Sequence, residues 1–116
     1  MHSLLLLLSL AASSSELSER CALSVYAVKP DGTLAAEATI KPDNVASVKS
    51  GGIDVSGMHL WFVKLNTDGA LVNSRFTKAS VGTRMAIFCG DREVSRALIA
   101  GQSTDEFMFS VSPDEP

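Results

Sequence analysis

The stretch from 65 to 99 constrains the fold of this chain most, because strand, helix, strand and hairpin signals follow one another there with few residues between them. The Asn-Thr-Asp sequence at 66–68 can cap a helix. It also places a negative charge in the first turn, where the charge interacts favourably with the helix dipole. Apolar residues at helical spacing then predict a helix at Thr67–Ser80. Its expected buried face consists of Gly69, Val72, Phe76 and Ala79.

Strands are predicted on both sides of this helix. After it, residues 84–89 and 93–99 form a hairpin around a Gly-Asp turn, and alternating apolar residues at 107–111 indicate a last strand. Before it, the strand at 59–65 is largely apolar on both faces, so we expect it in the interior of a sheet. One face carries Trp61, Val63 and Leu65, and the other carries Leu60, Phe62 and Lys64.

The first half of the chain has weaker signals. Residues 21–28 predict a first strand, and residues 33–40 predict a short one with many alanines. One helical turn is expected at 43–48, followed by a flexible, glycine-containing connection at 50–57. The whole pattern predicts an α+β domain: a mostly antiparallel sheet of four to six strands with the helix packed on one face.

Composition and charge narrow the functional class. The hydrophobic content of 46% suits a single globular domain. The formal net charge of −3 argues against nucleic acid as a partner, because such proteins normally carry a basic excess. Basic residues still outnumber acidic ones between Lys64 and Arg96, where they either solvate a face or form a docking patch.

A leucine run at 4–8 is followed by small residues. This pattern predicts a signal peptide at 1–15 and a single domain at 16–116, although the leader could instead be a buried or disordered segment. The run is far shorter than the ~20 residues that span a bilayer, and no later segment is long and apolar enough. We therefore expect an exported protein, periplasmic or secreted, with no integral membrane segment.

The two cysteines, Cys21 and Cys89, both lie in predicted strands. In an oxidising compartment they form a disulfide if those strands are close, and otherwise they are two buried thiols. The two histidines are far apart in the sequence, so no metal site and no cofactor are predicted.

His59 is the only histidine after the predicted leader. It lies near Asp54 and Ser56, but no nucleophile elbow surrounds any serine. A lone histidine at the start of a strand is usually structural, so the sequence predicts a protein that is not an enzyme. A small hydrolase is the least favoured alternative.

Several short motifs between 65 and 99 occur in a fixed register. In order they are Gly69-Ala70, Phe76-Thr77, Val81-Gly82, Arg84-Met85-Ala86-Ile87, Ser95 and Ile99. In this register the chain resembles the periplasmic head domain of SecD-type protein-export membrane proteins, which precedes their transmembrane bundle. The resemblance implies an α+β fold and a part that contacts emerging polypeptide. We expect none of the family's proton-driven work to carry over, because that work is attributed to the bundle.

One helix position departs from the family pattern. Asn73 stands where the family usually buries an aromatic side chain, so we expect Val72 to provide that packing.

These observations favour a non-enzymatic binding module for polypeptides or an envelope protein. Leu60 and Phe62 would form an exposed apolar strip, although loops or a second short helix ordinarily bury such residues. Arg84, Arg92 and Arg96 near the hairpin would supplement a binding site or simply keep the protein soluble. The alternative is a structural or assembly protein of the cell envelope, and the oligomeric state is not defined by the sequence.

Overall fold

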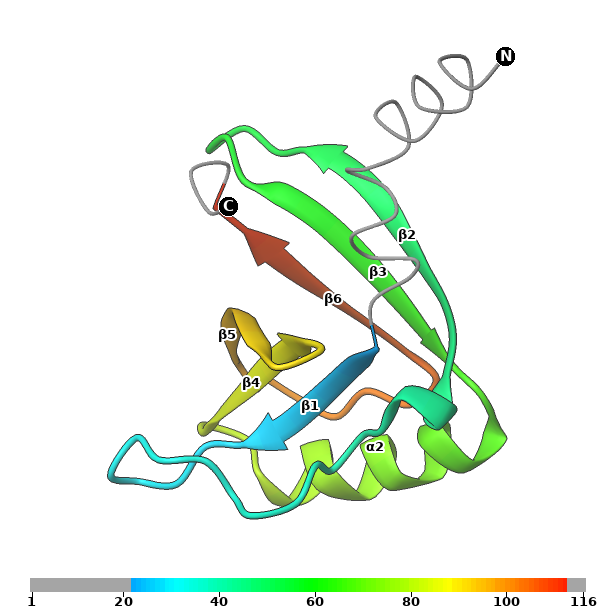
Figure 1. Ribbon diagram of the computed structural model, residues 1–116, viewed down its shortest axis with the longest axis vertical. Coiled ribbons are helices and arrows are strands. Elements are labelled where there is room, and N and C mark those ends of the chain that lie inside the picture. The colour runs from blue at the N-terminus through cyan, green and yellow to red at the C-terminus, as the bar shows by residue number, and fades with distance from the viewer. Residues whose placement is uncertain (1–21, 113–116) are drawn as a thin grey trace, which may run out of the picture.

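The computed structural model describes residues 22–112 (Figure 1). This part of the chain contains six strands, one α-helix and a short 3-10 helix. The elements are β1 (Leu23–Ala27), η1 (Pro42–Asn44), β2 (Val45–Ile53), β3 (His59–Leu65), α2 (Thr67–Ala79), β4 (Arg84–Cys89), β5 (Arg92–Leu98) and β6 (Glu106–Val111).

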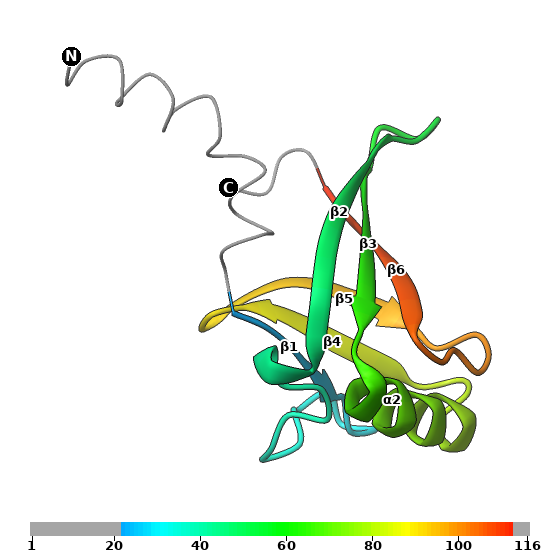
Figure 2. The same ribbon diagram turned by 90° about the vertical axis from the view of Figure 1, so that its right-hand side faces the viewer.

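The strands form two antiparallel sheets of three strands each, in the orders β1-β4-β5 and β2-β3-β6. The predicted α+β class is confirmed, and β3 is the central strand of its sheet as expected. Figure 2 shows β2, β3 and β6 rising from α2, while β4 and β5 run across them. The helix lies along the end where the two sheets come together (Figures 1 and 2).

The hydrophobic core draws on both sheets. Trp61 and Val63 of β3 are buried, as the alternation in the sequence predicts, and so is Phe109 of β6. They belong to one cluster with Val25 of β1 and Ile87 of β4, so burial of apolar surface holds the two sheets together. The Ser95 hydroxyl also donates to the Ser110 carbonyl at 2.8 Å and links β5 to β6.

Three predictions for the first half of the chain are wrong. The helical turn expected at 43–48 is limited to η1, which ends at Asn44, and residues 45–48 belong to β2. Residues 33–40 form no strand: Ile40 makes an isolated bridge to Val25 of β1, and Leu34 makes one to Val28 just after β1. The expected connection at 50–57 instead continues β2 as far as Ile53. This strand pairs along β3 with register shifts after Val45 and after Ser50, so its glycines are accommodated at an irregular edge.

The start of α2 follows the capping signal. Asn66 Oδ1 accepts a hydrogen bond from the Gly69 N–H at 2.9 Å, and Asn66 Nδ2 donates to the Asp43 carbonyl at 2.7 Å. One side chain therefore caps the helix and attaches it to η1. Gly69 fits this junction because a Cβ there would lie 2.7 Å from the Asn44 carbonyl oxygen.

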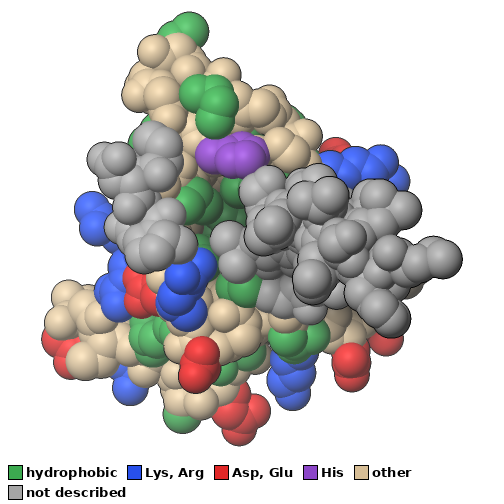
Figure 3. Space-filling model, turned by 45° about the horizontal axis from the view of Figure 1, so that its top comes forward, with side chains coloured by type: hydrophobic (Ala, Val, Ile, Leu, Met, Phe, Trp, Pro, Cys, Tyr) green, Lys and Arg blue, Asp and Glu red, His purple; other side chains and the backbone are tan. Residues whose placement is uncertain are grey.

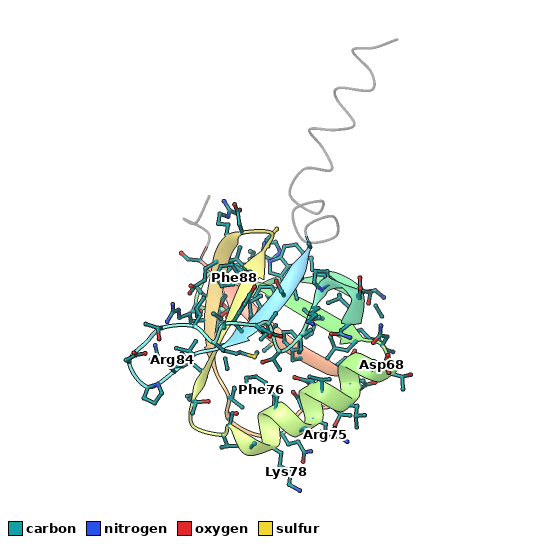
Figure 4. The ribbon with its side chains drawn as sticks, turned by 60° about the horizontal axis from the view of Figure 1, so that its bottom comes forward. Asp68, Arg75, Phe76, Lys78, Arg84 and Phe88 are labelled. Carbon is teal, nitrogen blue, oxygen red and sulfur yellow. The ribbon has the colours of Figure 1, made fainter. Side chains whose placement is uncertain are left out.

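The buried face of α2 differs from the expected one. Gly69, Asn73 and Thr77 are buried, whereas Val72 is 37% exposed and Ala79 is also exposed. Phe76 does pack against the core, and Figure 4 shows it pointing from α2 toward the strands. The face of α2 that packs against the loop before β6 is therefore polar. The prediction that Val72 provides the packing of the family's buried aromatic side chain is wrong.

Candidate functional site: an open sheet face and a group of arginines

Apolar side chains are exposed on the side of the β2-β3-β6 sheet opposite the core. Phe62 of β3 is 44% exposed and Met108 of β6 is 51% exposed. The two residues are direct partners across the strands, and Leu60, which is half-buried, is the next β3 residue on the same side. We call Leu60, Phe62 and Met108 the outer face.

The outer face is open because of where the segment 41–57 lies. Loops or a second short helix would ordinarily bury Leu60 and Phe62, but this segment forms η1 and β2 and continues the sheet sideways. The expectation of burial is therefore wrong for Phe62. The Phe62 ring lies against β2, since a Cβ on Gly51 would fall 2.2 Å from its Cε2 atom.

Two lysines border the outer face. Lys49 of β2 is the partner of Phe62, and Lys64 of β3 is the partner of Glu106. Both lysines are exposed. The face thus combines an apolar centre with a charged rim, which also contains the exposed Glu106 opposite Lys64, and a polar rim around an apolar patch is typical of interaction surfaces. Met108 was missed at the sequence level, although the inward alternation of Phe107 and Phe109 assigns it to this side.

The three arginines that the sequence predicted as part of a binding site lie on the β1-β4-β5 sheet. Arg84 begins β4, while Arg92 and Arg96 belong to β5. The structure therefore separates them from Leu60 and Phe62 rather than joining all five residues in one site. Figure 3 shows basic side chains beside acidic ones on one flank of the molecule.

Arg96 is held in place by its neighbours. Its Nε and Nη2 atoms donate to the Glu93 carboxylate at 2.5 and 3.2 Å, and Nη1 donates to the Gly32 carbonyl at 2.9 Å. The hydrogen bond with Glu93 raises the pKa of Arg96 above its ordinary value.

His59 is the first residue of β3, and its ring stacks on that of Trp61 with centroids 4.3 Å apart. Its Nε2 atom is 2.8 Å from Ser50 Oγ. The Asp54 carboxylate instead accepts from Ser56 and Met58, and its pKa is lowered mainly by the Ser56 side-chain hydrogen bond. Within residues 22–112 no carboxylate hydrogen-bonds to His59, so the third member that orients a serine–histidine pair is missing there.

Other predictions concern the ends of the chain and metal binding. The leader at 1–15 and Cys21 lie outside the described residues, so the Cys21–Cys89 disulfide stays a prediction. In the described part of the chain, no helix has the length and apolar character needed to cross a membrane. The same residues contain no cluster of three or more metal-ligating side chains.

Comparisons with known proteins show which solved structures have a similar fold. No family model matches the chain, and no curated protein matches it at the level of sequence. The solved structures that match it in three dimensions include two of SecDF. One is described as a membrane component, SecDF, that enhances protein export: it has a TM-score of 0.64 and 14% identity, and the match covers 86% of this chain and 60% of that one.

The other is SecDF in a super-membrane-facing form, with a TM-score of 0.65, 15% identity, and coverage of 84% of this chain and 18% of that one. The chain therefore spans less than two thirds of either SecDF chain. At such low identity the likeness concerns the fold alone. The expected resemblance is confirmed: this chain has a fold similar to that of a SecD-type domain.

Proposed function

We propose that this protein is a non-enzymatic module that acts outside the cytoplasm and binds extended polypeptide segments on its outer face. One observation carries the proposal: Phe62 and Met108 are partners on adjacent strands and remain 44% and 51% exposed. Removing such side chains from water contributes about 25 cal/mol per Å² of apolar surface. A binding partner would supply that burial.

The chemistry around the outer face favours one kind of segment. Apolar side chains of the ligand would cover Phe62 and Met108, and an acidic side chain would approach Lys49, whose cross-strand partner is Phe62 rather than an acid. The SecDF structures add support from the fold, since SecDF is described as enhancing protein export. A periplasmic or secreted location and a polypeptide or envelope partner both follow from this proposal.

The test is a binding titration with a fluorescent, unstructured peptide that alternates apolar and acidic residues. We expect Phe62→Ser to weaken binding about tenfold, because burying an aromatic side chain is worth roughly 1.5–3 kcal/mol. Gly51→Ala should also weaken it, since the added Cβ forces the Phe62 ring away from β2. This second variant moves the Phe62 ring but removes no apolar side chain of the face.

Leu71→Ser is the matched control, because Leu71 is 53% exposed on α2 and lies outside the outer face. Circular dichroism and thermal melting establish that each variant is folded. Equal affinity for the Leu71 and Phe62 variants would refute the proposed site. The His59→Ala variant should bind the peptide like the wild type. If the protein were instead a hydrolase that uses His59, this variant would lose peptide turnover.

A further inference from the structure

We propose that a hollow at one end of the β1-β4-β5 sheet binds a multiply charged oxyanion, either a phosphate or a group of carboxylates. The hollow has a volume of about 380 Å³, which lies within the range of small-ligand sites. Its lining includes Lys29, Arg84 and Arg96. This site is distinct from the outer face and does not depend on the function proposed for it.

Two turns and one strand pair build the hollow. Gly32 and Gly82 have φ values of 89° and 92°, and a Cβ on either would meet nothing within 4 Å. The glycines thus allow tight turns and leave the space open. Arg96 is the partner of Ala86 and Arg84 is the partner of Leu98, so the two arginines are diagonal neighbours on one side of the sheet.

The three cations differ in their remaining hydrogen-bonding capacity. Arg96 uses three of the five N–H donors of a guanidinium, and its bonds to Glu93 and Gly32 fix its position and leave two donors for a ligand. Among residues 22–112, Lys29 and Arg84 form no ion pair. Arg84 lies beside the loop that follows β1, well apart from Arg75 and Lys78 on α2 (Figure 4).

The local charge is opposite to that of the whole chain. The protein has a formal net charge of −3, yet no described carboxylate lines this hollow. Two acids belong to neighbouring residues: Glu93 pairs with Arg96 and offsets its charge, and Asp31, between the lining residues Pro30 and Gly32, accepts hydrogen bonds from Thr33. Lys29 and Arg84, which form no ion pair within residues 22–112, lie beside the anchored guanidinium of Arg96 and attract a compact anion. Guanidinium groups match the geometry of phosphate and carboxylate oxygens.

The test is an NMR titration of the 15N-labelled protein with sodium phosphate, citrate or a blocked triglutamate peptide. Sodium chloride at matched ionic strength controls for screening of exposed charges. We expect saturable shifts at the amides of Gly32, Gly82 and Thr83, and no shift at Gly57 in the distant β2–β3 turn. Tighter binding of the peptide would identify carboxylates of a polypeptide as the source, and tighter binding of the free anions would identify a small molecule.

Arg84→Gln should weaken binding about tenfold, because the anion loses a charged hydrogen-bond donor. Lys29→Gln gives an independent test if the Arg84 variant does not fold. Arg75→Gln, which removes an exposed cation on α2, should bind like the wild type. Shifts that chloride reproduces, or that persist unchanged in the Arg84 and Lys29 variants, would overturn the proposal.

Discussion

Asn73 is a polar residue whose side chain is completely buried in the middle of α2. Its Nδ2 atom donates to Ser103 Oγ at 3.0 Å and to the Thr104 carbonyl at 2.9 Å. Thr77, one turn later, accepts from the Ser103 N–H at 2.9 Å. These bonds attach the helix to the loop before β6, so the loop position depends on two side chains.

We expect Asn73→Ala to lower the free energy of unfolding by about 1–3 kcal/mol, because the loop acceptors lose their buried donor. Urea denaturation followed by circular dichroism measures the change. Lys78→Ala on the exposed side of the same helix is the control and should stay within about 0.5 kcal/mol of the wild type. An equally small effect at position 73 would show that these hydrogen bonds do not stabilise the fold.

At the scale of the elements, α2 and η1 meet more closely than most packed elements because Gly69 has no side chain. A Cβ at this position would lie 2.8 Å from the Asn44 Cβ and 3.2 Å from the Leu65 Cβ. The Asn66 N–H, which donates to the Asn44 carbonyl at 2.9 Å, holds the same junction. The end of β3, the start of α2 and η1 therefore form one tightly packed corner.

Gly69→Ala should destabilise the protein even though alanine is favoured over glycine in a helix by about 1 kcal/mol. Overpacking against backbone typically costs about 1–3 kcal/mol, and here the Asn44 carbonyl cannot move away without breaking its bond to Asn66. Thermal melting of this variant against Gly101→Ala checks the prediction. A Cβ at Gly101 meets nothing within 4 Å, so a melting temperature that falls equally in both variants would contradict it.

The elements differ in how far the sequence predicts them. The start of α2 and the β4–β5 turn were predictable because their signals are local: Asn66 caps the helix, and Gly90 has a φ of 66° in a two-residue turn. The strand β2 was missed because its Lys, Ser and Gly residues have low strand propensity, and pairing with β3 decides its conformation.

The sites show the same limit. The side of β3 that carries Phe62 follows from alternation, but its exposure depends on the path of β2, which the sequence pattern does not define. Burial of Asn73 depends on acceptors about thirty positions later in the chain. The grouping of Arg84 with Arg96 and Lys29 likewise arises from strand register and from a turn that is distant in sequence.

At the scale of the whole molecule, the pairing of β1 with β4 places the start of β1 next to the end of β4, far away in the sequence. Leu23 is the partner of Cys89 in β1–β4, and the Gly90 N–H donates to the Ala22 carbonyl at 3.0 Å. Cys21 directly precedes Ala22 in the sequence. This register supports the predicted pairing of Cys21 with Cys89 within one chain.

We expect a Cys21–Cys89 disulfide to stabilise the folded protein by about 2–4 kcal/mol, because it constrains the unfolded chain. Mass spectrometry of unreduced proteolytic fragments should find the linked peptide, and reduction should lower the melting temperature. Two alkylatable thiols in the unreduced protein would contradict the prediction. A covalent dimer on non-reducing electrophoresis would show that the bridge joins two chains instead.

The outer edge of β2 has a consequence for how this molecule coexists with its own copies. A sheet whose edge strand has unpaired backbone groups risks growing into fibres when strands of neighbouring molecules line up edge to edge. In β2 two register shifts interrupt the regular spacing of the backbone amides, and the charged Lys49 adds repulsion between identical edges. We therefore expect the face to remain available for a partner while the edge beside it discourages polymerisation.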